Sequence, residues 1–359
     1  MIRQGKGKLA KRLCAAALLT AVCLAAAPYS AASAPVPGDA DGNGALTAAD
    51  YFLLKRHILK TFRLPDPSVC DMNGDGVLDM KDYMLLKRML LPEPPVLPDL
   101  SSIARTEGEE TNLPASKTAA LTSFLSATED VSVFYCTLDG RDYYAYNAAE
   151  RFRTASTAKV PYCHWLCDSA DRGETDLDEK LVYDASKLRV GSPVMEKAKD
   201  GQSFTVRELI DASVRNSDNT AFRMMIYRFG TKDYAAWLRE QGSSFVPERF
   251  GLGECDAVEL GILYLNYARY RFSGSGNADL FWEAGADAKY RGGVAGAMQG
   301  LTVFHKYGAL SPPSEVTFND AAVVLSDRPF VLVVLTKNGA GGADRSELFG
   351  KICGLVRKI

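Results

Sequence analysis

The pattern of apolar and polar positions after residue 100 changes along the chain, and it predicts strands in some segments and helices in others. Runs rich in β-branched and aromatic residues between turn residues predict strands, because such side chains suit a pleated surface. The first two runs flank Asp139-Gly140, a tight-turn pair, and predict an antiparallel hairpin. We expect strands at 131–138, 143–146, 321–325 and 330–336, and helices at 158–170, 205–230 and 256–272. Strands at both ends with helices between them predict an α+β or α/β sandwich whose sheet is built from both ends of this region.

The first 34 residues have the pattern of a secretory signal peptide. Five basic residues with no acid precede an apolar run at 13–27, and small residues follow. The run is too short to span a bilayer, which takes roughly 20 residues, and no later run approaches that length. Ala32 and Ala34 both suit cleavage, and Cys23 lacks the context of a lipid anchor. We therefore expect an exported protein without a membrane anchor in the mature chain.

Composition excludes some partners. Without the five basic residues of the signal, 37 of the 42 Lys and Arg remain against 44 Asp and Glu. This mildly acidic balance argues against nucleic acid or an anionic membrane surface. Six cysteines also remain, which permit disulfides in an exported chain without fixing their pairing. Cys163 and Cys167 lie one helical turn apart but lack the second ligand pair that a zinc site needs.

An acidic loop followed by an apolar-basic helix occurs twice, 32 residues apart. Each loop has oxygen-bearing side chains at alternate positions, a glycine for the sharp turn, and a backbone carbonyl to complete an oxygen set that suits Ca²⁺. The ligand sets are Asp39, Asp41, Asn43, Ala45, Thr47 and Asp50 in the first loop, and Asp71, Asn73, Asp75, Val77, Asp79 and Asp82 in the second. Two such loops in register predict two structural Ca²⁺ sites.

The helices after the two loops are near copies, Tyr51-Phe-Leu-Leu-Lys-Arg and Tyr83-Met-Leu-Leu-Lys-Arg. With loops that end in Asp rather than Glu, this repeat resembles a type I dockerin. The resemblance implies a small all-α module that docks onto a cohesin of a scaffolding protein, as in cellulosomes. It also implies a set of contact residues, although the Lys-Arg pairs equally suit a solvated helix face. These residues are Ala48, Ala49, Lys55, Arg56, Met80, Lys81, Lys87 and Arg88.

Three short motifs follow in the second region. Ser156-Thr-Ala-Lys159 opens a predicted helix, Ser217-Asp-Asn219 precedes a helical stretch, and His305-Lys-Tyr-Gly308 precedes the terminal strands. Each occurs often by chance, but the three in this order indicate nucleophilic serine catalysis. Ser156 and Lys159 share a helix face, so the amine can take the hydroxyl proton if the ammonium of Lys306 depresses its pKa. The Ser156 amide at a helix N-terminus suits an oxyanion.

Together the motifs resemble those of class A β-lactamases and penicillin-binding proteins, over residues 115–359. The resemblance implies a three-layer αβα sandwich with an antiparallel sheet, and an acyl-enzyme formed with β-lactams or with D-amino-acid peptides of the cell wall, without a cofactor. It implies these roles: Ser156 is the nucleophile, Lys159 its base, Ser217 the relay to the leaving nitrogen, Asn219 a positioner, Lys306 the substrate-carboxylate partner, Gly308 a space-clearing residue and Ala309 the second oxyanion donor. No cysteine lies near Ser217, so the disulfide that some members form from the position of Cys163 should be absent.

Two departures from that family bear on activity. Tyr307 stands where a small hydroxyl residue is usual, which leaves the substrate preference open. The E-x-x-L-N signature of the loop that carries the deacylating glutamate is missing between Asn219 and His305. The candidate glutamates there are Glu240, Glu248, Glu254, Glu259 and Glu283, of which Glu254 is best placed but suits a helix N-terminus better. We therefore expect slow deacylation.

Other interpretations are weaker. A Ser-His-Asp triad would have to use His164 or His305, and neither has a suitable context. A carbohydrate hydrolase lacks its paired carboxylates in this region. A non-hydrolytic penicillin-binding, peptide-binding or adhesion module remains the alternative. We expect a signal peptide at 1–34, a dockerin at 35–91, a proline-rich extended linker at 92–100 and a β-lactamase-like serine hydrolase domain at 101–359, exported and held on a scaffold or the cell surface.

Overall fold

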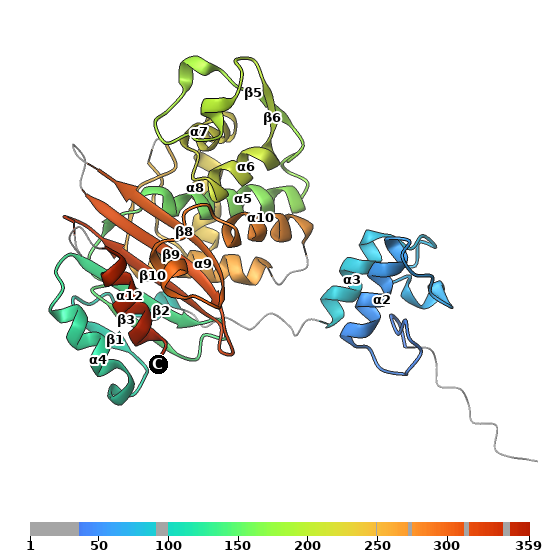
Figure 1. Cartoon of the computed structure of the whole chain (residues 1–359), viewed down its shortest axis with the longest axis horizontal. Coiled ribbons are helices and arrows are strands. Elements are labelled where there is room, and N and C mark those ends of the chain that lie inside the picture. Colours follow the sequence, from blue (N-terminus) through green and yellow to red (C-terminus); the bar gives the residue numbers. More distant parts are fainter. Residues whose placement is uncertain (1–35, 91–99, 249, 272–274, 312–315, 340–344) are drawn as a thin grey trace, which may run out of the picture. The chain divides into compact units, whose positions relative to one another are not determined.

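The computed structural model describes residues 36–90, 100–248, 250–271, 275–311, 316–339 and 345–359 (Figure 1). The expected signal peptide and nearly all of the expected linker lie outside these ranges. The chain divides into two compact units, one ending at Leu86 and the other beginning at Lys87, and each is described by itself. None of the described helices is both long and apolar enough to cross a membrane.

The first unit is built from two helices and the loops before them. Helix α2 (Ala48–Ile58) begins with a capping box, in which the Thr47 hydroxyl and the Asp50 carboxylate satisfy opposing backbone amides. Helix α3 (Met80–Leu90) follows the second loop, and a 3-10 turn, η1 (Pro67–Cys70), lies between them. The rings of Tyr51 and Tyr83 stack with centroids 4.2 Å apart, which brings the two repeats together helix to helix.

A six-stranded antiparallel sheet is the centre of the second unit. Its order is β1 (Glu109–Thr111), β3 (Tyr143–Tyr146), β2 (Val131–Thr137), β10 (Phe330–Thr336), β9 (Thr317–Leu325) and β8 (Thr302–Leu310). The pairing of β2 with β10 joins the two ends of the region over seven residues, from Phe330 opposite Thr137 to Thr336 opposite Val131. The predicted mixed fold, with a sheet built from both ends, is confirmed.

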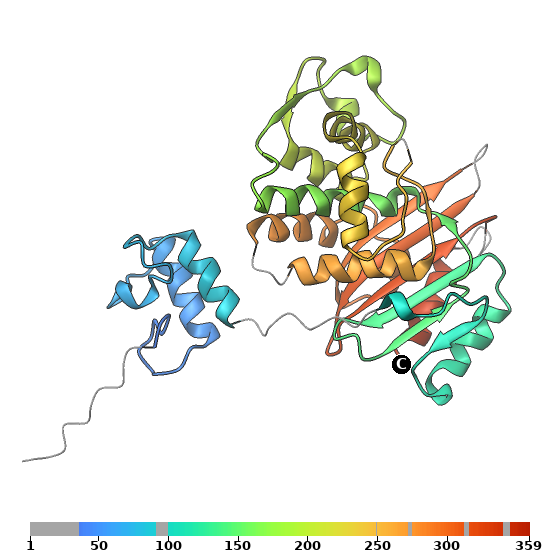
Figure 2. The ribbon, with the colours of Figure 1, turned by 180° about the vertical axis from the view of Figure 1, so that it is seen from behind.

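Helices cover both faces of this sheet, which gives three layers (Figures 1 and 2). Helices α4 (Ala115–Ser126), α11 (Gly293–Ala297) and α12 (Arg345–Val356) lie on one face, and α9 (Ala257–Arg271) lies on the other. Successive strand residues point to opposite faces, so Val133 and Val334 join one buried cluster while Phe134 and Val333 join the other. This is why β2 and β10 are buried along their whole length.

A helical lobe completes the second unit. It contains α5 (Lys159–Asp171), α6 (Val206–Arg215), α7 (Asn219–Phe229), α8 (Lys232–Glu240), α10 (Gly276–Ala286), the strand pair β5 (Lys180–Val182) and β6 (Ser203–Thr205), and the short turns η4 (Ala185–Lys187) and η5 (Met195–Lys197). The prediction of one helix over 205–230 is wrong. The chain breaks at 216–218, where Ser217 has a φ of 57° and the Asp218 carboxylate caps α7.

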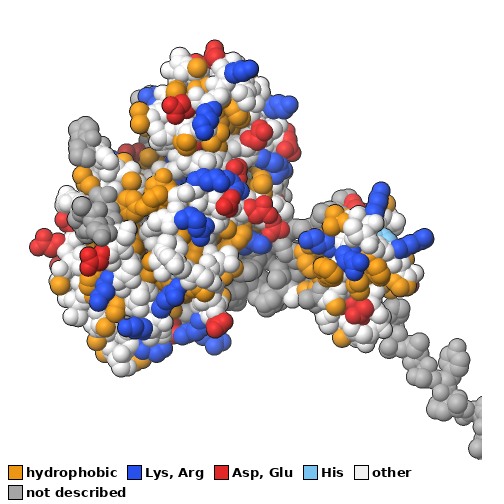
Figure 3. Space-filling view, in the orientation of Figure 1, with side chains coloured by type: hydrophobic (Ala, Val, Ile, Leu, Met, Phe, Trp, Pro, Cys, Tyr) orange, Lys and Arg blue, Asp and Glu red, His pale blue; other side chains and the backbone are white. Residues whose placement is uncertain are grey.

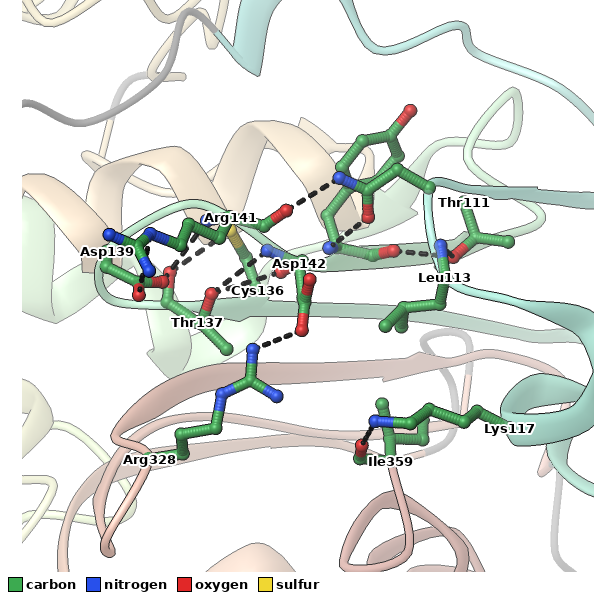
Figure 4. Close-up of polar contacts among 12 residues, drawn as sticks. Thr111, Leu113, Lys117, Cys136, Thr137, Asp139, Arg141, Asp142, Arg328 and Ile359 are labelled. Carbon is green, nitrogen blue, oxygen red and sulfur yellow. Dashed lines mark hydrogen bonds and ion pairs between the residues drawn. The ribbon is translucent and has the colours of Figure 1, made fainter.

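The third motif precedes the two terminal strands β9 and β10, as predicted. It lies inside β8, a strand that the sequence analysis did not predict, and β9 begins at Thr317 instead of Ala321. Polar contacts join the β2–β3 turn to the start of β10, and α4 to the last residue of the chain (Figure 4). Arg328, just before β10, pairs with Asp142 of the β2–β3 turn, and the Lys117 ammonium of α4 donates to the Ile359 carbonyl at 2.6 Å.

Candidate active site

Ser156 lies in a single 3-10 turn, η3 (Ala155–Ala158), which runs directly into α5 at Lys159. Ala155 before it has a φ of 48°, a left-handed conformation that is strained for a residue with a side chain. Thr154 holds the turn, because its hydroxyl donates to the Gly253 carbonyl at 3.0 Å and its carbonyl accepts from the Thr157 hydroxyl at 2.6 Å. The turn therefore presents Ser156, itself half-buried, at a fixed position.

Edge strand β8 packs against this turn. A Cβ atom at Gly308 would lie 2.7 Å from the Ser156 nitrogen and 2.9 Å from the Ala155 Cβ, so only glycine allows so close an approach. Strand β8 is last in the sheet, so among the described residues no strand pairs with its outer side. Ala309, the expected second oxyanion donor, is the next residue of the strand.

Lys159 is almost fully buried, and three oxygen atoms hold its amine. Its Nζ donates to the Ser217 carbonyl at 2.7 Å, to Asn219 Oδ1 at 2.8 Å and to the Asp218 carbonyl at 3.3 Å. Burial holds the pKa of Lys159 at about 7, far below its usual range, because desolvation penalises the ammonium. Among the described residues no hydrogen bond joins this amine to the Ser156 hydroxyl.

Lys306 forms the second half of the site. Its buried Nζ donates to Ser217 Oγ at 2.9 Å and to the Tyr307 carbonyl at 2.8 Å. Burial and the neighbouring Lys159 lower the pKa of Lys306 well below its usual range. Burial is the largest cause of the lowered pKa of Lys159, for which the sequence analysis had considered only the neighbouring Lys306 ammonium.

Asp218 is a functional position to which the sequence analysis assigned no role. Its buried carboxylate accepts four backbone amides, from Val194, Met195, Thr220 and Ala221, at 2.9–3.0 Å. These bonds fix the left-handed turn at Ser217 that aims the backbone carbonyl at Lys159. The signal was present in the sequence, since Asp before a helical stretch is a preferred N-cap.

Tyr307 replaces the small hydroxyl with a phenol. Its ring lies 4.1 Å from that of Tyr290, centroid to centroid, and Lys306 Nζ lies 4.3 Å from the centroid of the Tyr307 ring. Burial raises the pKa of the Tyr307 phenol, an effect opposed by its hydrogen bond with Ser217. The small hydroxyl usual in the family is thus replaced in this chain by a phenol that packs against the Tyr290 ring and lies near Ser217.

Each of the five candidate glutamates either pairs with other residues or has an exposed side chain. Glu254 lies in the short strand β7 (Glu254–Cys255), which pairs with β4 (Phe152–Arg153), and its carboxylate lies 3.8 Å from the Arg153 guanidinium. Its interpretation as a helix N-terminal acid is wrong, since Asp256 caps α9 instead. Glu259 is buried between Arg151 and Ser244. The side chains of Glu240, Glu248 and Glu283 are exposed. Within the described ranges, no carboxylate hydrogen-bonds to Ser156 or Lys159.

His164, His305 and the cysteines of the described residues are buried. His164 is buried among aromatic rings, and burial lowers its pKa to about 3. His305 Nδ1 lies 3.1 Å from Asp320, and in the part of the chain that the structure describes neither histidine contacts Ser156. All six cysteines of the described residues are buried and unpaired. They are Cys70, Cys136, Cys163, Cys167, Cys255 and Cys353.

In both acidic loops of the first unit the first Asp accepts two backbone amides of its own loop. In the first, the Asp39 carboxylate accepts the Asn43 and Gly44 amides; in the second, Asp71 accepts those of Gly74 and Gly76. Ligand atoms of Asp39, Asp41 and Asp50 lie within 4.8 Å of one another. Asp50 and Asp82, which end the loops, are fully buried. Buried carboxylates converging in this way fit a hard cation such as Ca²⁺.

The helices after the loops carry an exposed apolar surface. Of the expected contact residues, Ala49 and Lys55 are exposed and Arg56 is half-buried. The side chains of Ala48, Met80, Lys81, Lys87 and Arg88 lie outside the described part. Sequence reasoning missed four exposed apolar residues of this surface, namely Phe52, Leu59, Leu85 and Met89. Hydrophobic side chains gather on one face of the unit, with Lys and Arg beside them (Figure 3).

Two family models match the chain. The model described as the beta-lactamase enzyme family matches residues 115–358. The model described as the dockerin type I domain matches residues 37–91. The first covers the helical lobe, the three sequence motifs and every strand of the sheet except β1, and the second covers both acidic loops.

Solved structures share the fold of the second unit. A beta-lactamase from Sphaerobacter thermophilus superposes with a TM-score of 0.58 at 20% identity, over 68% of this chain and 97% of that chain. A beta-lactamase from Chitinophaga pinensis gives a TM-score of 0.59 at 18% identity, over 68% and 97%. The structure of PBP-A gives 0.59 at 19% identity, over 67% and 94%. At these identities the likeness is one of fold.

Proposed function

We propose that this chain, which belongs to the beta-lactamase enzyme family and carries a type I dockerin domain, is an exported serine hydrolase that forms an acyl-enzyme on Ser156. Its substrates are β-lactams or D-amino-acid peptides of the cell wall. The observation that carries the proposal is the linked set of hydrogen bonds from Lys159 through Asn219 and Ser217 to Lys306, next to Ser156.

Acylation follows from these groups. Ser156 Oγ attacks the substrate carbonyl carbon while Lys159, neutral in an appreciable fraction because its pKa is about 7, takes the hydroxyl proton. The amides of Ser156 and Ala309 donate to the oxygen that becomes negative. Ser217 gives its proton to the leaving nitrogen as the C–N bond breaks, and Lys306 reprotonates Ser217 over their 2.9 Å hydrogen bond. The ester on Ser156 is the product of this half-reaction.

Deacylation has less support, and we propose that it is slow. Hydrolysis of the ester needs a base that activates water. The candidate glutamate Glu254 lies beside Arg153, with almost half of its side chain exposed. Losing a positioned general base costs roughly a hundred- to ten-thousandfold in rate. The protein would then behave as a penicillin-binding protein or a slow β-lactamase, and in the limit as a non-hydrolytic binding module.

For the first unit we propose two structural Ca²⁺ ions and a cohesin partner. Asp39, Asp41 and Asp50 would hold one ion, and Asp71, Asp75 and Asp82 would contribute to the other. Bound calcium supplies the positive charge that lets these carboxylates remain close together. The cohesin would contact the exposed apolar and basic face, which places the hydrolase outside the cell on a scaffold or at the surface.

Intact mass spectrometry of the mature protein with penicillin tests the proposal. We expect a mass increase of one penicillin within seconds to minutes that decays slowly, and no increase in Ser156→Ala. Circular dichroism of Ser156→Ala controls for folding. Absence of any covalent adduct on the folded wild-type protein, with penicillin and with a peptide ending in D-Ala-D-Ala, would overturn the assignment.

A further inference from the structure

The helical lobe has a groove of about 300 Å³ beside the catalytic residues, between the segment from β5 to η4 and helix α7. Figure 1 shows these elements at the top of the second unit. Helix α7 begins at Asn219, whose side chain holds Lys159. Arg223 and Tyr227 follow at intervals of four residues and so lie on the same side of the helix. One such interval is about 6 Å, so the groove begins one turn from the catalytic site.

Positive charge dominates the groove. Five cations line it or lie at its edge, whereas among the described residues Asp184 is the lining carboxylate and Glu179 and Asp200 lie beside it. The cations are Lys180, Lys187, Arg189, Arg223 and Arg228. Asp184 pairs with Lys187 at 3.0 Å, and Glu179 pairs with Arg228 at 2.5 Å. Over the described ranges, no carboxylate lies within ion-pair distance of Lys180, Arg189 or Arg223. Three positive charges are therefore available to an anion.

Two of these guanidinium groups converge. The Arg223 and Arg189 guanidinium groups lie close enough to the Tyr227 hydroxyl to lower the pKa of that phenol. The Phe250 ring lies 3.6 Å from the Arg223 guanidinium carbon and so restricts its position. Guanidinium groups are planar forks that match the two oxygens of a carboxylate. Both guanidinium groups lie near the Tyr227 hydroxyl, and their N–H groups can donate to the carboxylate of a ligand.

The loop that carries Arg189 also borders the catalytic site. The Arg189 amide donates to the Thr220 hydroxyl at 2.9 Å, and the next carbonyl, that of Val190, accepts from Asn219 Nδ2 at 2.8 Å. Val190 itself is 97% exposed, an apolar residue at the rim. Gly191 is required next to it, because a Cβ there would lie 2.7 Å from Asn219 Nδ2. A ligand on Ser156 that extends past Asn219 would therefore meet Val190 and then Arg189.

We infer that this groove binds a carboxylate on the acyl side of a peptide substrate, so that the enzyme prefers acidic peptides to neutral ones. The inference rests on the proposed acylation of Ser156 and names its substrate class. Because Ser217 and Lys306 serve the leaving nitrogen, the retained part of the peptide extends away from them, past Asn219. An acidic side chain upstream of the acylated residue would then reach Arg189 and Arg223.

The test measures binding without chemistry. Full-length protein with Ser156→Ala is titrated calorimetrically with two peptides that end in D-Ala-D-Ala, one with a free upstream side-chain carboxylate and one with the corresponding amide. We expect the acidic peptide to bind at least about tenfold more tightly. A tenfold change in Kd corresponds to about 1.4 kcal/mol, and a hydrogen bond to a charged group contributes more than that. Adding Arg189→Gln or Arg223→Gln should each remove most of this preference while leaving the affinity for the amide peptide within about twofold.

Arg239→Gln is the matched control, because Arg239 is exposed on α8 in the same lobe and outside the groove. Arg189 lies on an exposed loop, where a substitution should not disturb folding. Arg189→Gln therefore still tests the inference if Arg223→Gln does not fold. Equal affinity for the two peptides, binding of neither, or the same loss in Arg239→Gln overturns the inference. These outcomes leave penicillin acylation of Ser156 untouched, whereas failure of acylation with the peptide preference intact overturns the proposed function instead.

Discussion

Each of the two units buries a pair of like charges. In the first unit the buried pair is Asp50 and Asp82, and in the second it is Lys159 and Lys306. A buried carboxylate retains its charge if hydrogen bonds and a cation compensate it, and both loops supply backbone amides to these acids. A buried ammonium can instead release its proton, and burial lowers the pKa of both lysines. The same burial therefore suits the role proposed for each pair, as metal ligands in one unit and as a base and its cationic partner in the other.

The two units also differ in how much apolar surface they bury. The described side chains of the first unit include few buried apolar residues, mainly Leu54, Leu64 and Leu86. The second has one large cluster on each face of its sheet. A module of about fifty residues with so small a core depends on bound ions for its stability. The second unit needs none, so its chemistry should be independent of calcium.

The largest effect is expected from removing calcium. Chelation, or the paired change Asp39→Ala and Asp71→Ala, should abolish the unfolding transition of the first unit, since binding at a thousandfold excess over Kd contributes about 4 kcal/mol per site. Differential scanning calorimetry with and without EGTA measures this. Cohesin binding should be lost with it, while Ser156 acylation and the transition of the second unit stay unchanged. An unfolding transition of the first unit that persists in EGTA would show that this unit does not depend on calcium and so does not differ from the second unit in this respect.

Gly308→Ala should reduce acylation by about a hundredfold, because a Cβ 2.7 Å from the Ser156 nitrogen pushes β8 away from an oxyanion donor. Stopped-flow acylation by nitrocefin measures the rate. Gly354→Ala in α12 is the matched control, since a Cβ there meets no atom within 4 Å and alanine suits a helix. A loss of less than about threefold in Gly308→Ala would show that the close contact has no catalytic role.

The pH profile tests whether burial makes Lys159 a base. Only the neutral amine accepts the Ser156 proton, and its pKa is about 7. The acylation rate should therefore fall about tenfold for each pH unit below 7 and level off above it. Because Lys159 and Lys306 titrate as a coupled pair, the measured midpoint belongs to both. Acylation rates between pH 5 and 9 decide the point, and a flat profile would exclude Lys159 as the base.

The smallest effect is expected at Glu254. Its carboxylate pairs with Arg153 in the β4–β7 ribbon, so Glu254→Gln should change deacylation by less than about twofold. Decay of the penicillin adduct, followed by intact mass, measures this rate. Glu248→Gln serves as the control, because Glu248 is an exposed acid in the neighbouring loop. A tenfold slower decay in Glu254→Gln alone would identify Glu254 as the missing deacylation base.

The sequence by itself determined the features that depend on neighbouring residues. The calcium loops follow from alternate oxygen ligands around a glycine, and strands 143–146 and 330–336 have the bounds that their apolar runs predicted. The residue types of all three catalytic motifs were readable for the same reason. The N-cap at Asp218 also had a local signal, because Asp is a preferred residue before a helix. The expectation of one continuous helix over 205–230 left that signal unused.

Only the tertiary structure decided how distant residues meet. Lys159 and Ser217 are 58 positions apart and Ser217 and Lys306 are 89 apart, so their contacts depend on how β8 and the helical lobe pack against η3. The cause of the lowered Lys159 pKa is burial, which no local pattern reports. The convergence of Arg189 and Arg223 on Tyr227 likewise joins a loop to a helix. Local sequence fixes backbone preference and residue type, whereas burial and the proximity of charges arise only when the layers are assembled.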